Sequence, residues 1–157
     1  MHGYSNGICV DLVIADLKAA DKRDALSLLA HRVAPLCGLA ADEIFEALSG
    51  RNRTLHSGIG EGIAIPHVRM KRIKKPFVTI AKLENAIPYN SVDDEPVNLI
   101  CMVLSPTQEG PLYLQRLSRI SRLLRRKELR MQLLAARNEN DMRAAIASAL
   151  SDHALAA

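Results

Sequence analysis

The sequence predicts a single α/β domain in which a small β-sheet lies between layers of helices. Helical patterns occupy the first and last parts of the chain, and short apolar runs of strand length separate them. The 157 residues are enough for one domain with a substantial core, and no internal repeat or linker divides them. We therefore expect one domain over residues 1–157, with an ordered core at about 8–152.

Two helices are predicted before the sheet. Between Asp21 and Leu36, leucine and valine recur at helical spacing, Asp21 can cap the start, and a glycine follows the end. A second helix is predicted from Asp42 to Ser49, and it also stops at a glycine. Residues 51–62 then follow neither the helical nor the strand period.

Three strands are predicted at residues 63–65, 77–83 and 97–105. The last, VNLICMVLS, is apolar throughout, as expected of a central strand covered on both faces. Because three strands make a thin sheet, we expect a further strand near residues 10–14 or within residues 54–59.

Helices are predicted again from Gly110 onward. The first reaches about Arg126, and shorter ones follow at 128–136 and 139–150. Four arginines recur at helical spacing along the first of these helices, at 116, 119, 122 and 126. We interpret this stripe as a solvated or docking face rather than a DNA-binding surface, because no helix-turn-helix or aromatic platform accompanies it.

Composition excludes several classes of protein. Aromatic residues make up only 3% of the chain, which argues against a stacking surface for single-stranded nucleic acid. No run approaches the length of a membrane span, and the N-terminus lacks the layout of a signal peptide. The three cysteines are far apart, so we expect reduced packing thiols in a cytoplasmic protein, without a zinc or disulfide framework.

The segment 57–67, SGIGEGIAIPH, carries the clearest chemical pattern. Three glycines, Gly58, Gly60 and Gly62, precede a short apolar strand that Pro66 is expected to end. His67 would then lie at a strand end, beside backbone N–H groups that could cradle a phosphoryl group or another anion. A basic run follows at residues 69–75, within a chain of net charge +4.

Phosphoryl transfer to nitrogen needs a neutral imidazole and donors that hold the equatorial oxygens. With a reference pKa near ~6.5, histidine supplies the neutral ring at neutral pH. The residues alone also fit a strand-ending turn in which His67 bonds to backbone and the glycines serve only the turn geometry.

GIGEGIAIPH resembles the phosphorylation-site segment of IIA components of the bacterial phosphoenolpyruvate-dependent phosphotransferase system, in the mannitol/fructose class. The resemblance extends over nearly the whole chain. Because no IIB or IIC module follows in this sequence, it is most similar to the stand-alone nitrogen-regulatory IIA type. This resemblance implies an α/β/α sandwich around a mixed sheet, with His67 accepting a phosphoryl group from an HPr-type carrier. It also implies that Arg51 neutralises phosphoryl charge.

Two positions depart from the family pattern. Members usually carry a second histidine at the start of the helix after the central strand, where this chain has Tyr113 in YLQRL. A tyrosine hydroxyl can donate one hydrogen bond to a phosphoryl oxygen. The sequence LHS also puts His56 where serine is usual, and His56 could act as a further donor.

The expected function is that of a phosphohistidine carrier that regulates target proteins according to its phosphorylation state. No metal or organic cofactor is expected, because this phosphoryl chemistry needs none. The alternative is a regulatory binding module, impaired in phosphorylation because Tyr113 replaces histidine, that acts by protein contact alone. Nucleic-acid binding through the arginine stripe is the least favoured interpretation. The sequence does not identify the downstream target. It is also compatible with transfer of the phosphoryl group to a separate IIB protein in sugar transport, and with phosphotransferase activity as an enzyme.

Overall fold

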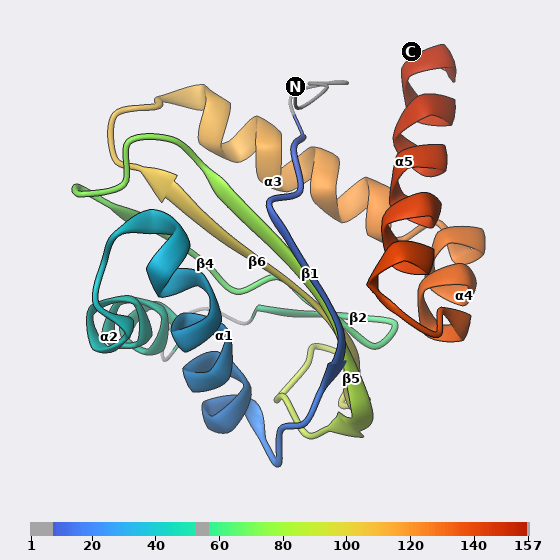
Figure 1. Cartoon of the computed structure of the whole chain (residues 1–157), viewed down its shortest axis with the longest axis horizontal. Coiled ribbons are helices and arrows are strands. Elements are labelled where there is room, and N and C mark those ends of the chain that lie inside the picture. Colours follow the sequence, from blue (N-terminus) through green and yellow to red (C-terminus); the bar gives the residue numbers. More distant parts are fainter. Residues whose placement is uncertain (1–7, 53–56, 157) are drawn as a thin grey trace.

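The computed structural model describes residues 8–52 and 57–156 and has three layers (Figure 1). A mixed sheet carries α1 (Lys22–Cys37) and α2 (Ala41–Asn52) on one face. The other face carries α3 (Pro111–Leu124), α4 (Lys127–Ala135) and α5 (Glu139–Ala156). The α/β/α sandwich with a mixed sheet is confirmed, and each predicted helix is present.

The sheet contains six strands in the described residues, in the order β1-β5-β6-β3-β2, with β4 also paired to β6. Their bounds are β1 Leu12–Leu17, β2 Gly58–Gly60, β3 Ile63–Ala64, β4 His67–Met70, β5 Phe77–Ile87 and β6 Val97–Pro106. β5 runs antiparallel to β6, whereas β3 and β4 run parallel to it. Both places where a further strand was expected carry one, as β1 and β2.

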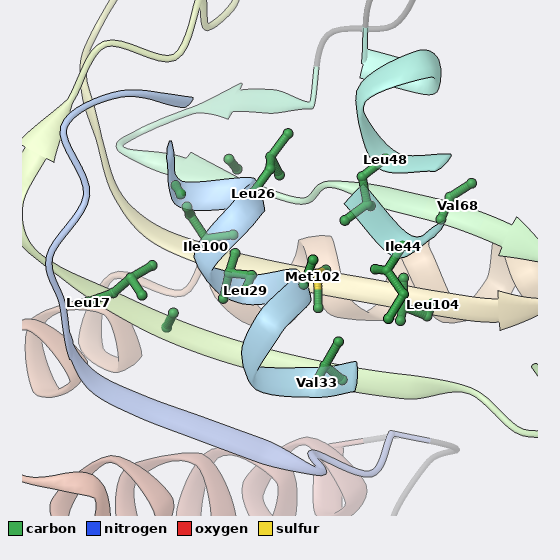
Figure 2. Close-up of a cluster of buried hydrophobic side chains, with 14 of the residues drawn as sticks. Leu17, Leu26, Leu29, Val33, Ile44, Leu48, Val68, Ile100, Met102 and Leu104 are labelled. Carbon is green, nitrogen blue, oxygen red and sulfur yellow. The ribbon is translucent and has the colours of Figure 1, made fainter. Parts of the chain in front are cut away.

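β6 is the central strand that its apolar run predicted, and it separates two cores. Its residues Ile100, Met102 and Leu104 pack with side chains of α1 and α2, such as Leu29 and Ile44 (Figure 2). The alternate residues Leu99, Cys101 and Val103 pack toward α3, α4 and α5. Complete burial raises the pKa of the Cys101 thiol to about 12, as expected of a packing cysteine.

The short strand before Pro66 is present as β3 and ends before the proline, but the sequence did not predict that a second strand begins directly after it, at His67. The chain continues as β4, so that β3 and β4 lie along the same edge of β6 with Pro66 between them. Proline has no N–H for the ladder, but its carbonyl still accepts a hydrogen bond from the Val103 amide at 2.9 Å. His67 therefore begins a strand, and strand geometry sets the direction of its side chain.

The predicted arginine stripe, which extends from α3 to the start of α4, is not a uniformly solvated face. Arg116 is buried and paired with Glu109, and Arg126 Nη1 donates to the Ala149 carbonyl at 3.1 Å. Arg122 is exposed, as predicted. Arg116, Arg119 and Arg122 lie on α3 at the predicted spacing, whereas Arg126 follows the end of α3 and is the N-cap residue of α4. Contacts with neighbouring segments decide which of these side chains face solvent. In the part of the chain that the structure describes, no helix has the length and apolarity to cross a bilayer.

Gly58→Ala is expected to destabilise the fold by about 2 kcal/mol through overpacking. A Cβ atom at Gly58 would lie 2.6 Å from Ser91 Oγ and 2.9 Å from Ser91 Cα, so backbone would have to move. The matched control is Gly50→Ala in α2, where a Cβ meets nothing within 4 Å and helix propensity should add about 0.5–1 kcal/mol. Urea unfolding of both variants measures the difference, and a neutral Gly58→Ala would contradict the tight contact.

Candidate functional site

His67 is half-buried at the first position of β4, opposite Val103 of β6. Its Nδ1 atom lies 2.6 Å from the carbonyl oxygen of Ile65. Because a carbonyl oxygen can only accept, this contact assigns the proton of the neutral ring to Nδ1. The lone pair is then on Nε2, which makes Nε2 the nucleophilic nitrogen.

The alternation of β4 divides its side chains between the two faces of the sheet. Val68 and Met70 are buried in the core formed with α1 and α2. His67 precedes Val68, and Arg69 lies between Val68 and Met70, so the side chains of His67 and Arg69 face the α3 side. Imidazole and guanidinium thus leave the same strand in the same direction.

Tyr113 lies in the first turn of α3 and is only 3% exposed. Its ring centroid is 6.1 Å from that of His67, with the two planes inclined at 51°. The structure therefore brings together the predicted acceptor and the residue that stands in the place of a second histidine.

Arg69 also lies beside Tyr113 at the candidate site, although the sequence analysis did not single it out. Its Cζ atom lies 4.9 Å from the centroid of the Tyr113 ring, a cation–π contact. The sequence analysis counted Arg69 only within the basic run 69–75. The i, i+2 spacing from His67 could have identified it, but only if the segment after Pro66 had been predicted as a strand.

A buried ion pair lies on the same side of the sheet. Arg116 is 9% exposed and binds Glu109 in a bidentate manner, with Nη1–Oε2 at 2.6 Å and Nη2–Oε1 at 2.5 Å. Nη1 also donates to Ser105 Oγ at 3.0 Å, and Ser105 is opposite Arg69 in the strand register. Glu109 therefore compensates the charge of Arg116.

The three glycines lie in the β2–β3 hairpin. Gly58 is opposite Ala64, while Gly60 and Gly62 flank the turn with φ of 95° and 78°. The positive φ of Gly62 accounts for this glycine, and a Cβ there would also lie 2.8 Å from Asn98 Oδ1. Along β6, Ile63 pairs with Leu99 and His67 with Val103. Four residues of strand, about 13 Å, therefore separate the turn end of the hairpin from the imidazole.

The family model for the phosphoenolpyruvate-dependent sugar phosphotransferase system, EIIA 2, matches residues 8–149. The chain belongs to this family. A nitrogen regulatory protein of Bradyrhizobium diazoefficiens is 34% identical over 131 residues, which cover 83% of this chain and 86% of that protein. The fructose-specific EIIA component of Haloferax volcanii is 34% identical over 106 residues, covering 68% and 69%.

A solved structure shares the EIIA fold. The nitrogen regulatory protein IIA-Ntr of Neisseria meningitidis superposes with a TM-score of 0.80 at 24% identity, covering 86% of this chain and 92% of that one. At this identity the likeness shows the fold, and it agrees with the three layers in Figure 1.

Two residues that the EIIA resemblance suggested cannot be placed at the site. The backbone of Arg51 belongs to α2, but its side chain lies outside the described residues, as does the whole of His56. Their roles stay predictions. Among the residues that the structure does describe, no three His, Cys, Asp or Glu side chains are grouped to hold a metal ion.

Proposed function

We propose that this protein is a phosphohistidine carrier and regulator in which His67 accepts a phosphoryl group from an HPr-type phosphocarrier. The observation that carries the proposal is the pairing of His67 with the carbonyl of Ile65, next to Tyr113, in a member of the EIIA 2 family. In the neutral imidazole, this arrangement keeps the proton on Nδ1 and leaves Nε2 as the nucleophile.

In the proposed transfer, Nε2 of His67 attacks the phosphorus of the carrier's phosphohistidine. The new N–P bond forms as the N–P bond of the donor breaks, and the donor imidazole leaves with the electron pair. The Nδ1–H hydrogen bond to Ile65 stabilises the positive charge that develops on the His67 ring. Arg51 and the hydroxyl of Tyr113 would hold the phosphoryl oxygens, and His56 is a further candidate donor.

Regulation would follow from a local change of charge. A phosphoryl group adds nearly two negative charges beside exposed cations such as Arg69 and Lys71. A target protein would therefore meet two different surfaces on the phosphorylated and free forms. The name of the Bradyrhizobium relative favours regulation, and the name of the Haloferax relative leaves transfer to a IIB protein in fructose transport as the second candidate.

The test supplies the purified protein with two phosphoryl donors. One is the complete cascade of phosphoenolpyruvate, enzyme I and HPr-type carrier, and the other is phosphoramidate, which needs no protein partner. Intact-mass spectrometry at mildly basic pH should show the gain of one phosphoryl group, and brief acid treatment should remove it. No gain with either donor would contradict the proposal and favour a module that acts by contact alone.

A further inference from the structure

We propose that Arg69, held against the ring of Tyr113, is a cation that binds the phosphoryl group carried by His67. This inference rests on the proposed function and adds a residue to it. Arg69 on β4 would then provide the positive charge that the second histidine of other family members could provide from the position of Tyr113 on α3. Tyr113 would act as a positioning residue through its ring.

The first support is the direction of the side chains. His67 and Arg69 are two residues apart on β4, so their Cα atoms are roughly 6.6 Å apart and both side chains face α3. The Tyr113 ring contacts both, with its centroid 6.1 Å from the imidazole and 4.9 Å from the guanidinium carbon. The guanidinium is therefore kept within the same small volume as the acceptor ring.

The second support is the distribution of charge. The ion pairs within the described residues leave Arg69 without a carboxylate partner, whereas Arg116 on the same side is neutralised by Glu109. Arg69 is also exposed, so an incoming phosphoryl group can reach it. Of these two arginines, only Arg69 has a charge that a phosphoryl dianion can use without first displacing a carboxylate.

The third support is the geometry of guanidinium. Its planar fork matches two phosphoryl oxygens at once, and stacking on an aromatic face keeps that fork oriented before the phosphoryl group arrives. Tyr113 is buried and lies in a helix, so its ring is a fixed support for the stack. This function needs the aromatic face of Tyr113, in addition to any hydrogen bond from its hydroxyl.

The experiment compares Arg69→Gln with Arg72→Gln, which removes the same charge from the same segment. Arg72 is exposed and paired with Glu43 of α2 instead of contacting Tyr113. Phosphorylation by phosphoramidate should slow about tenfold in Arg69→Gln, as expected for loss of a charged hydrogen bond, and less than twofold in Arg72→Gln. Arg69→Lys, which keeps the charge without the fork, should fall between them.

A second readout separates phosphoryl binding from a structural role. In ³¹P NMR titrations of the phosphorylated protein, Arg69→Gln should move the second ionisation of the phosphoryl group to higher pH, because a bound cation favours the dianion. Arg72→Gln should leave it in place. Tyr113→Leu should shift it as far as Arg69→Gln does, and Tyr113→Phe, which keeps the ring, should shift it less.

The outcomes distinguish this inference from the proposed function. If the unmodified protein is phosphorylated but Arg69→Gln matches Arg72→Gln in rate and in titration, the assignment of Arg69 is overturned and the carrier function stands. If Tyr113→Phe shifts the titration as far as Tyr113→Leu, the positioning role of the ring is overturned. If the unmodified protein accepts no phosphoryl group from either donor, both proposals fail.

Discussion

Replacing His67 by glutamine is expected to lower acid-labile phosphorylation at least about 100-fold, because the amide has no nucleophilic nitrogen. The matched control is His31→Gln. His31 also has its Nδ1 near a backbone carbonyl, that of Ser27 at 2.8 Å, but it is exposed on α1 across the sheet from Tyr113. His31→Gln should leave phosphorylation unchanged. His31 shares the Nδ1–carbonyl contact of His67, but it lacks the neighbouring side chains that surround His67.

The measurement is intact-mass spectrometry of both variants after exposure to the HPr-type carrier cascade and to phosphoramidate. ¹⁵N NMR of the phosphorylated native protein then identifies the modified nitrogen, which the Ile65 contact predicts to be Nε2. Phosphorylation that survives His67→Gln would move the acceptor to another residue. Attachment at Nδ1 would show that the Ile65 hydrogen bond breaks during transfer.

The elements that could be predicted from the sequence are those with a strong local pattern. β6 was identified because its residues are apolar on both faces, and α1 because its start and end carry capping residues. β4 was missed because HVRM is short and follows a proline, so nothing local marks it as a strand. What makes it a strand is parallel pairing with β6, which is more than thirty residues away in the chain.

The candidate site divides in the same way. The motif positions predict His67 and Tyr113 as site residues, and the structure brings their rings together. They do not predict Arg69, because its position beside Tyr113 depends on a strand that the sequence does not indicate. Arg116 was assigned to a solvated or docking face, since helical spacing alone cannot show that Glu109, in the loop before α3, turns back to meet it. Site residues defined by long-range contacts need the fold before they can be identified.

The buried pair between Arg116 and Glu109 leads to a large expected effect on stability. Glu109→Gln should lower the free energy of unfolding by about 3 kcal/mol, because it leaves a guanidinium of 9% exposure with no compensating charge. For a chain of this size, that corresponds to a fall in Tm of roughly 10 °C. Glu43→Gln is the matched control, since the Arg72–Glu43 pair is 64% and 35% exposed and should contribute under about 1 kcal/mol.

The double variant Glu109→Leu/Arg116→Met tests the cause of that effect. If the cost of Glu109→Gln comes from an uncompensated buried charge, removing both charged groups should recover most of the lost stability. If the pair instead holds β6 and α3 together through its hydrogen bonds, including the one to Ser105, the double variant should stay as unstable as the single one. Urea unfolding of Glu109→Leu, Arg116→Met and the double variant, analysed as a double-mutant cycle, measures the coupling directly. Recovery would mean that Glu109 is retained mainly to neutralise Arg116, which agrees with the inference that Arg69, and not Arg116, offers an uncompensated charge to the phosphoryl group.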